Sequence, residues 1–240
     1  MKRFVLDTHT HTTASGHAYG TVLEMAKAAS EAGLSLLAVT DHAPKMPGGP
    51  DPMYFCNFKV IPRTLYGVEI LMGAELNVID YRGTVDLEEG LLKRMAVCIA
   101  SLHTVCLVPG SRRENTRALL GAMENPHVHV IGHPDDGHYP LDYEELIRGA
   151  KAAGVLIEVN NSSLVPGGSR TCSRENLGEI LRLCRKLDQQ VVVNTDSHFP
   201  ASVGRFDEAL KLLEENHFPE ELVVNSDPEK FKKYLNRSGL

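Results

Sequence analysis

Short β-branched or apolar runs alternate with longer stretches of helical periodicity along the whole chain. This alternation is typical of repeated strand–helix units around a parallel sheet. The runs with strand character are 4–9, 36–41, 70–77, 98–102, 128–131, 155–160, 191–195 and, with a weaker pattern, 222–225. The helical stretches are 21–32, 115–124, 142–153, 173–187, 205–216 and 228–234. For a chain of 240 residues, this number of units predicts an α/β fold, a TIM-like (βα) barrel as a single domain over residues 1–240; a doubly wound sheet is the alternative.

Helix-capping residues support several of these boundaries. Thr21 with Glu24 three residues later, and Asp142 with Glu145, have the spacing of a capping box at a helix start. The segment 44–62 differs from the rest, because its prolines, glycines and aromatic residues show no clear period. We therefore expect helices to begin at the two capping sites and a long ordered loop over 44–62.

Charge and hydropathy exclude several classes of protein. A formal net charge of -6 argues against bulk electrostatic binding of nucleic acid or of an anionic membrane. No apolar run approaches the roughly 18 residues of a spanning helix, and the N-terminus leads directly into a strand-like segment rather than a signal-peptide core. The five cysteines are scattered without a CxxC pair, so no disulfide framework is indicated. We expect a cytoplasmic protein without a membrane partner; a homo-oligomer is compatible with the sequence.

Seven histidines and two carboxylates lie at or just beyond the C-terminal ends of the predicted strands. His9 and His11 form an HxH pair, whose period of two sends both side chains to the same side of a strand. In a parallel barrel the C-terminal strand ends converge on one face, where active sites of this architecture are built. The residues expected to meet there are His9, His11, His17, His42, Glu75, His103, His133, Asp196 and His198.

This mixture of imidazole and carboxylate groups suits divalent cations such as Zn²⁺, Mn²⁺ or Fe²⁺. Each histidine taken singly is more often a hydrogen-bonded structural residue than a ligand, so the joint pattern carries the inference. Nine donors are too many for one ion, and at roughly three or four ligands per ion they indicate two or three ions. The other histidines fall outside strand ends and are assigned structural or surface roles: His127, His129, His138 and His217.

Six short motifs resemble the successive motifs of the PHP family, which is named for polymerases and histidinol phosphatases. They are His9-Thr10-His11-Thr12, Thr40-Asp41-His42, Gly73-Ala74-Glu75, Ser101-Leu102-His103, Ile131-Gly132-His133-Pro134 and Thr195-Asp196-Ser197-His198. Three more segments are similar to the stand-alone YcdX-type PHP phosphatases: His17-Ala18-Tyr19, Ile61-Pro62-Arg63 and the segment 158–163. The resemblance covers nearly the whole chain. It implies a distorted seven-stranded (βα) barrel with a trinuclear metal site, and it makes the weak eighth strand peripheral.

The resemblance also implies how the ligands are shared. His9, His11, Glu75 and Asp196 would hold one ion, Glu75, His103 and His133 a second, and His17, His42 and His198 a third. Glu75 would bridge the first two, which is physically reasonable because a carboxylate has two oxygens and its charge reduces the repulsion between two cations. The imidazole-rich set favours zinc for all three ions, with manganese and iron as alternatives.

The function that follows is a metal-dependent phosphatase or phosphoesterase that hydrolyses a small phosphoester with a metal-activated hydroxide. We expect Asp7 and Asp41 to orient imidazoles or to carry protons. Arg63 is the first candidate for holding the phosphate, followed by Arg170 and Arg113. No protein nucleophile is expected, because a metal-activated hydroxide needs none and the sequence contains no GxSxG or P-loop segment.

Other functions stay open on the sequence alone. Within the same chemistry, the protein could be a histidinol-phosphate phosphatase or a nuclease-like phosphodiesterase, although the acidic net charge disfavours a nucleic acid partner. A different class is a non-catalytic, metal-dependent binding or regulatory protein, which would keep the ligands and lack turnover. A small phosphorylated substrate is the partner that we expect.

Overall fold

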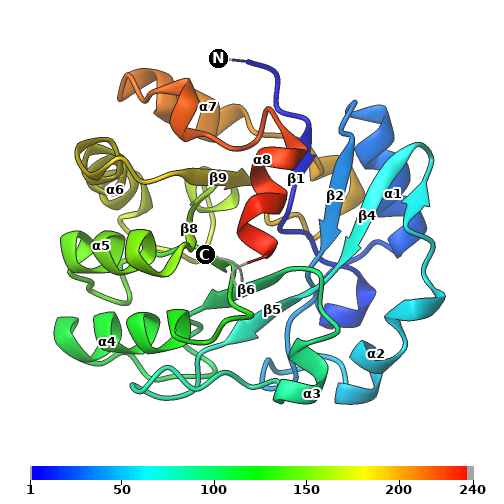
Figure 1. The fold of residues 1–240 in the computed structure, drawn as a ribbon, viewed down its shortest axis with the longest axis horizontal. Helices are drawn as coiled ribbons and strands as arrows, with labels where there is room; N and C mark the ends of the chain where they lie inside the picture. Colours follow the sequence, from blue (N-terminus) through cyan, green and yellow to red (C-terminus); the bar gives the residue numbers. More distant parts are fainter. Residues whose placement is uncertain (1, 237–240) are drawn as a thin grey trace.

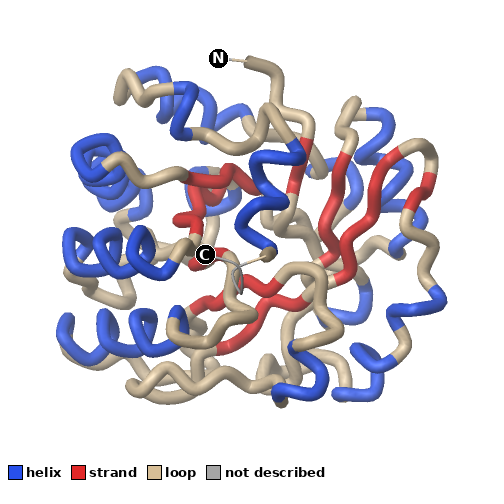
Figure 2. Tube along the Cα trace, viewed as in Figure 1, coloured by secondary structure: helices blue, strands red, loops and turns tan. Residues whose placement is uncertain are grey.

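The computed structural model describes residues 2–236, and its strands lie at the centre with helices around them (Figures 1 and 2). The strands are β1 (Leu6–Asp7), β2 (Leu36–Val39), β3 (Thr64–Leu65), β4 (Val68–Met72), β5 (Ala74–Asn77), β6 (Cys98–Ser101), β7 (Val130–Ile131), β8 (Leu156–Asn160) and β9 (Val191–Asn194). The α-helices are α1 (Val22–Glu31), α2 (Pro52–Cys56), α3 (Glu89–Leu92), α4 (Arg112–Met123), α5 (Tyr143–Ala153), α6 (Ser173–Leu187), α7 (Asp207–Glu215) and α8 (Pro228–Lys232). Strands and helices thus alternate as the sequence pattern predicts.

The strands form two sheets, and the chain passes directly from β4 in the first sheet to β5 in the second. Their orders are β1-β2-β4-β3 and β5-β6-β7-β8-β9, and each pair is parallel except β3 with β4. β4 passes through Gly73 into β5, where a Cβ would lie 2.1 Å from the carbonyl oxygen of Val97, so only glycine allows this close approach. A parallel bridge between Thr10 and Ser197 joins the chain beyond β9 to the chain beyond β1. The result is a distorted (βα) barrel with β4 and β5 as one bent strand, which confirms the predicted fold class.

The barrel interior contains an apolar layer at the beginnings of the strands. Phe231 enters it from α8, which lies across the middle of the ring of strands in Figure 1, and its side chain is fully buried. All strands except β3 and β4 are buried on both faces because helices cover the outside of the barrel, which explains their nearly continuous apolar sequences. The layer consists of Leu6, Leu36, Ala38, Val97, Ile99, Val130, Leu156, Val192, Val224 and Phe231.

The helices begin where the capping residues predict. Thr21 and Glu24 form a reciprocal capping box at the start of α1. The side chain of Asp142 accepts a hydrogen bond from the backbone N–H of Glu145, and α5 ends at Gly154 in a left-handed conformation with φ 64°. These local signals fix where α1 and α5 start, so that the apolar face of each packs on the outside of the barrel.

Four segments differ from the sequence-based expectation. The segment 44–62 is not entirely loop, because α2 and a 3₁₀ turn at Phe58–Val60 lie within it, with Asp51 as the N-cap and Pro52 in the first turn. α3 and the antiparallel β3 were not predicted; each is too short to show a period. The weak strand at 222–225 is a 3₁₀ turn (Glu220–Leu222) followed by a single bridge from Val223 to Val191. The carbonyl oxygen of Asn225 accepts from the backbone N–H of Val5, so this segment lies between β9 and the chain that enters β1, and the expected peripheral position is wrong.

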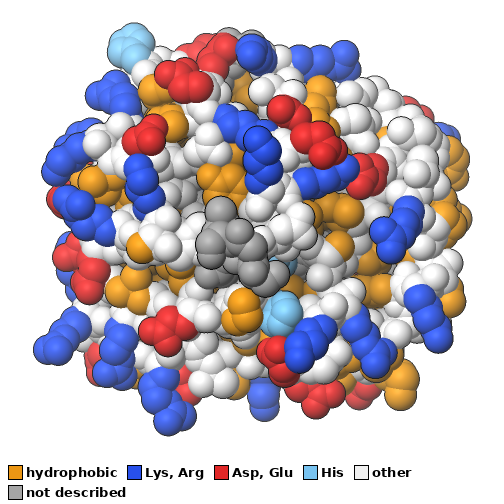
Figure 3. Space-filling view, in the orientation of Figure 1, with side chains coloured by type: hydrophobic (Ala, Val, Ile, Leu, Met, Phe, Trp, Pro, Cys, Tyr) orange, Lys and Arg blue, Asp and Glu red, His pale blue; other side chains and the backbone are white. Residues whose placement is uncertain are grey.

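The surface and the helices show no membrane-spanning feature in the described part of the chain. None of the helices at residues 2–236 combines the length and apolar character needed to cross a membrane. On the face seen in Figure 3, basic and acidic side chains are interspersed rather than separated into large areas of one sign. This face therefore offers no extended cationic surface of the kind that binds a phosphate backbone.

Candidate metal centre

Glu75 lies at the centre of the cluster of predicted ligands. Its Oε1 atom is 2.9 Å from His133 Nε2, 3.3 Å from His103 Nε2 and 3.4 Å from His9 Nε2. Its Oε2 atom is 2.6 Å from His42 Nδ1. His11 Nε2 also lies 3.6 Å from Oε2. Glu75 is 1% exposed and comes from β5, so five histidines from four other segments of the chain surround one buried carboxylate.

Asp196 holds the other side of the cluster. Its Oδ1 atom is 3.2 Å from His11 Nε2, 3.6 Å from His9 Nε2 and 3.6 Å from His198 Nδ1. His17, which is exposed, joins through its Nε2 atom, 3.2 Å from His198 Nε2. Together with the residues around Glu75, all nine predicted side chains lie in one continuous cluster at the C-terminal ends of the barrel strands.

Several buried atoms of this cluster have no hydrogen-bond partner. They include His9 Nε2, His11 Nε2, His42 Nδ1 and Glu75 Oε2. His42 Nδ1 and Glu75 Oε2 are close, but they are not aligned as a hydrogen bond. Unpaired buried polar atoms are costly, whereas a divalent cation would satisfy imidazole nitrogen and carboxylate oxygen together. The donor set therefore fits a metal site.

Three overlapping groups have donor atoms within 4.8 Å of one another. One contains His9, His11 and Asp196, as the family resemblance implies for the first ion. The other two share His42, which joins His11 and His198 in one group and Glu75 and His103 in the next. His42 is therefore placed between the second and third sets of expected ligands rather than wholly in the third.

Glu158 on β8 orients two of the histidines. His9 Nδ1 donates to its Oε1 atom over 2.7 Å, and the backbone N–H of His133 donates to its Oε2 atom over 2.7 Å. The side-chain amides of Asn194 and Asn160 also donate to Glu158, at 2.8 and 3.0 Å. Because the carboxylate can only accept, the neutral ring of His9 carries its proton on Nδ1 and directs the Nε2 lone pair into the cluster.

Asp41 acts on His11 through Ser15. The hydroxyl of Ser15 donates to Asp41 Oδ1 over 2.7 Å, so its oxygen accepts from His11 Nδ1 at 3.0 Å and leaves the His11 Nε2 lone pair free. Asp41 also accepts from the hydroxyl of Tyr54 on α2 over 2.6 Å. Asp41 therefore orients an imidazole indirectly, and the segment predicted to be a loop supplies part of the support.

Opposite charges dominate the electrostatics of the cluster. Burial lowers the pKa of His9, but the charges of Glu158, Glu75 and Asp196 outweigh burial and hold that pKa well above its usual range. Burial lowers the pKa of His11 well below its usual range, and the charge of His42 acts in the same direction. Burial raises the pKa of Glu75, but the histidines, His9 first, outweigh it and hold that pKa well below its usual range. Protons are therefore distributed unevenly over the cluster, and they compete with cations for the same atoms.

Two of the nine residues have unusual backbone conformations. His133 has φ 26° and Asp196 has φ 52°, which is uncommon for residues other than glycine. Beside His133, a Cβ on Gly132 would lie 2.2 Å from Ser101 Oγ, so the chain packs too closely there for another residue. Backbone conformations of this kind occur mainly where function requires a side chain in a fixed position.

Arg170 is the basic side chain brought to this centre. Its Nη2 donates to Asp196 Oδ2 over 2.8 Å and its Nη1 to Ser163 Oγ over 3.1 Å. It also lines a cavity of about 340 Å³, whose walls include His17, His42, His103 and His198. A guanidinium beside clustered metal-type donors is placed to bind a phosphate oxygen.

The other predicted catalytic residues lie elsewhere. Arg63 does not join the cluster; it lines a separate cavity on the flank of the barrel, so its position does not support a contact with phosphate at this centre. Arg113 is exposed in the first turn of α4.

Asp7 contacts no imidazole side chain in the hydrogen bonds described; it accepts from Thr195 Oγ1 over 2.5 Å and from the Thr195 backbone N–H over 3.1 Å. Burial raises the pKa of Asp7 to about 6, and its position fixes the residue next to Asp196.

Histidines assigned to other roles lie away from strand C-termini. His127 is paired with Glu89 at 3.2 Å, and His138 with Asp136 at 2.7 Å. The buried His129 accepts a hydrogen bond from the backbone N–H of Cys98. Histidine content alone thus does not mark the centre; position at a strand end does.

Sequence reasoning assigned no role to Glu158, Ser15 or Asn77. Asn77 Oδ1 lies 2.8 Å from His103 Nδ1, and thus orients that ring as Ser15 and Glu158 orient theirs. A usable signal existed for Glu158, because it precedes Asn160 by two residues on a strand and therefore faces the same side. Ser15 gave no comparable signal, since it lies in a 3₁₀ turn whose direction is set by tertiary contacts.

Comparisons with known proteins give a family, similar relatives and similar folds. The family model of the PHP domain matches residues 7–162. A protein of Clostridium novyi named "Probable phosphatase" is 47% identical over 237 residues, covering 99% of this chain and 96% of that protein. The histidinol phosphate phosphatase of Lactococcus lactis, solved with zinc, L-histidinol and phosphate, has a TM-score of 0.62 at 19% identity and covers 89% of this chain and 94% of its own. The phosphotriesterase of Mycobacterium tuberculosis has a TM-score of 0.53 at 12% identity, covering 98% and 95%.

Proposed function

The chain belongs to the PHP domain family and is a hydrolase of phosphoric esters; on this premise we propose that it is a metal-dependent phosphatase that removes phosphate from a small phosphorylated molecule. The observation that carries the proposal is the convergence of nine nitrogen and oxygen ligands, some of them buried and unpaired, around Glu75 and Asp196. A buried cluster of this composition stabilises a folded chain poorly by itself, so its arrangement serves bound cations.

We assign three divalent cations to the cluster, with zinc as the first candidate and manganese or iron as alternatives. One would be held by His9, His11, Glu75 and Asp196. A second would be held by Glu75, His103 and His133, and a third by His17, His42 and His198. Bound cations would supply positive charge that stabilises the phosphoryl oxygens in the transition state and acidifies an attacking water.

The chain itself supplies orientation. Glu158 and the Ser15–Asp41 pair fix the protonated nitrogens of His9 and His11, so that each ring presents a lone pair to the centre. Arg170 would bind a non-bridging phosphate oxygen from the open side of the cluster. The cavity of about 340 Å³ lies in the size range of sites for small molecules, which favours a small phosphomonoester over a polymer.

The test combines metal analysis with hydrolysis of p-nitrophenyl phosphate. Protein purified without chelator should contain close to three divalent ions per chain and release phosphate. Asp196→Ala and His9→Ala should each bind less metal and lose activity by roughly 100-fold or more, because each removes a ligand from the first ion. His138→Ala is the matched control, since this histidine is paired with Asp136 outside the cluster.

Three results would contradict the proposal. Near-normal turnover of folded Asp196→Ala would reject the assignment of that ligand. Metal-loaded wild-type protein that releases phosphate from no member of a panel of phosphomonoesters, including histidinol phosphate, would favour a non-catalytic binding protein. Oligonucleotide shortening without monoester hydrolysis would favour a phosphodiesterase instead.

A further inference from the structure

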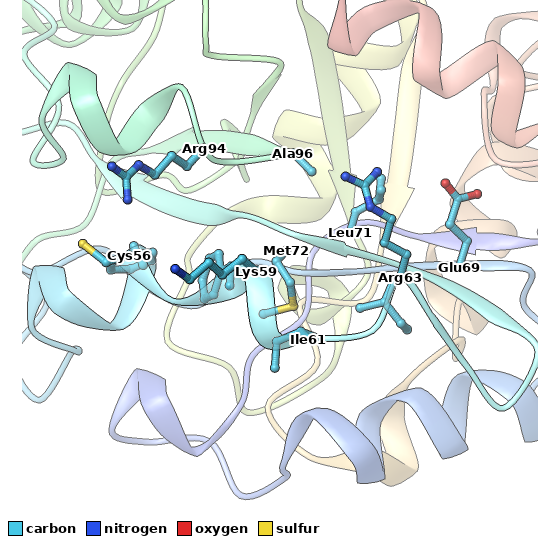
Figure 4. A pocket seen from close by; sticks show the side chains of 12 residues that line it. Cys56, Lys59, Ile61, Arg63, Glu69, Leu71, Met72, Arg94 and Ala96 are labelled. Atoms are coloured by element: carbon cyan, nitrogen blue, oxygen red, sulfur yellow. The ribbon is translucent and has the colours of Figure 1, made fainter.

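A second cavity lies on the flank of the barrel, and none of the nine predicted ligands lines it (Figure 4). Its volume is about 460 Å³, within the range of small-molecule sites. It is built by α2, the 3₁₀ turn Phe58–Val60, the segment 61–63, β4 and the residues 94–96 that lead to β6. The cavity thus lies where β4 has separated from β6 and pairs with the short β3 instead.

The floor of this flank cavity is apolar. Phe55, Ile70 and Met72 line it and are 0%, 4% and 9% exposed, so their side chains belong to the hydrophobic core. Ile61 and Leu71 add half-buried aliphatic surface. A concave apolar floor of this kind favours a ligand with an apolar or aromatic body.

The rim of the flank cavity is cationic. Lys59, Arg63 and Arg94 line it and are exposed, and Figure 4 shows Lys59 and Arg94 toward Cys56 with Arg63 on the opposite side. Among the interactions of residues 2–236, none pairs these three side chains with a carboxylate or another hydrogen-bonding group.

The one carboxylate in the lining does not neutralise this rim. Glu69 is paired with Lys232 of α8 at 2.8 Å, and Figure 4 shows its carboxylate pointing away from Lys59 and Arg94. By contrast, the surface Arg174 is paired with both Glu208 and Glu215. In a chain with more acidic than basic residues, three unpaired cations around one apolar cavity form a local positive field.

We propose that the flank cavity binds a small organic anion that combines an apolar or aromatic body with a carboxylate, phosphate or sulfonate group. The body would lie on Met72 and Ile61. The guanidinium group of Arg63 on one side of the cavity, or that of Arg94 on the other, would bind the anionic group, because its planar donors match two oxygens at once. This assignment gives a role to Arg63, which its sequence motif singles out and the metal centre does not use.

Occupation of the flank cavity is independent of the phosphatase site. Arg170 and the histidines of the metal centre line a different cavity, and the two sets of lining residues share no member. A ligand of the flank cavity should therefore bind whether or not phosphate occupies the metal centre. Binding at the flank cavity and phosphatase activity at the metal centre can therefore be measured separately, and the failure of one proposal is distinguishable from the failure of the other.

The test uses 1-anilinonaphthalene-8-sulfonate, which carries an aromatic body and a single anionic group, on the full chain. We expect saturable fluorescence enhancement, and a shift of the Met72 methyl resonance in protein labelled at methionine methyl groups and assigned with Met72→Leu. The double variant Arg63→Gln/Arg94→Gln should weaken binding about 10-fold or more, because it removes the guanidinium group on each side of the cavity that could bind the sulfonate. The uncharged N-phenyl-1-naphthylamine should bind wild type and variant alike.

The matched control is Arg113→Gln/Lys211→Gln, which lowers the net charge by the same amount at exposed positions outside the cavity. This control should keep wild-type affinity. Equal weakening in the two double variants would overturn the proposal, since it would show only a bulk charge effect. Weakened dye binding in Arg170→Gln, which changes only the cavity at the metal centre, or an unshifted Met72 resonance at saturation, would also overturn it.

Discussion

The two ends of the barrel use the same strands for opposite chemistry. Leu6 and Leu156 are fully buried in the apolar layer that Phe231 closes. His9 and Glu158 follow on the same two strand segments and are also fully buried, but they hydrogen-bond to each other in the polar cluster. These residues are fully buried at both ends, so burial does not distinguish the ends. The difference is that burial alone is favourable for apolar side chains, whereas buried polar atoms need a bonding partner.

This difference divides stability from function. Removing apolar surface from water is favourable by roughly 25 cal/mol per Å², so the apolar layer around Phe231 stabilises the fold by itself. Buried charges and unpaired polar atoms are unfavourable without a partner. The polar cluster around Glu75 and Asp196 therefore contributes fully to the stability of the fold only when cations are bound. Substitutions at the two ends should accordingly change different measured quantities, and four experiments test that separation.

The largest effect is expected for Glu75→Gln at the polar end. The amide keeps the size of the side chain but loses the charge that two cations would share, so we expect kcat/KM to fall by roughly 1,000-fold, about 4 kcal/mol in activation free energy. The unfolding free energy of the metal-free protein should not fall. Glu69→Gln, on the neighbouring β4, is the matched control and should keep activity. A fall of less than tenfold for Glu75→Gln would show that the two ends are not functionally distinct.

Phe231→Ala should have the complementary effect at the apolar end. Removing a fully buried aromatic ring leaves a cavity and should lower the unfolding free energy by roughly 3–5 kcal/mol. Because α8 lies at the opposite end from the ligands, kcat/KM well below the melting temperature should stay within about threefold of wild type. Urea denaturation measures the first quantity and steady-state kinetics the second. Phe231→Leu is the control and should cost less than about 1.5 kcal/mol.

Much of the polar end could be predicted from sequence because parallel strands impose a simple rule. Residues at strand C-termini meet on one face, so the strand-end histidines, Glu75 and Asp196 could be placed together without knowing any contact. Arg63 and Arg170 show where this rule stops. Neither lies at a strand end, and which arginine reaches the cluster depends on the path of a long loop over the barrel, which no local pattern determines.

The apolar end and the short elements were less predictable for a different reason. Phe231 has the local signature of a residue in a short C-terminal helix, but its position inside the barrel depends on how α8 packs across it. α2 spans only five residues, Pro52–Cys56, so no hydrophobic period could show it. Its cap at Asp51 was a usable signal, and the aromatic residues that follow pack into the core as the apolar floor of the flank cavity.

Removing the metal should have an intermediate effect on the stability of the fold. Cations that bind only the folded state at 100 times their dissociation constant should add about 2.7 kcal/mol, which raises the melting temperature by roughly 5–10 °C for a chain of this length. Zinc-loaded and chelator-treated protein should differ by this amount. Phe231→Ala should show the same increment, because the two ends are independent, whereas Asp196→Ala should lose most of it. Equal increments in both variants would place the stabilising metal outside the predicted cluster.

The smallest effect should come from Glu158→Gln, which changes no predicted ligand. A glutamine oxygen can still accept from His9 Nδ1, but the amide nitrogen then faces the backbone N–H of His133 and the side-chain amide of Asn160, which are both donors. The rings should lose orientation rather than their ligand atoms, so metal affinity or kcat/KM should fall by about 10- to 100-fold. Glu214→Gln on α7 is the exposed control. Zinc titration and kinetics of Glu158→Gln show how His9 is oriented. Unchanged affinity and activity would mean that packing alone holds the His9 ring. The expected fall would mean that the Glu158 carboxylate sets the direction of the His9 lone pair.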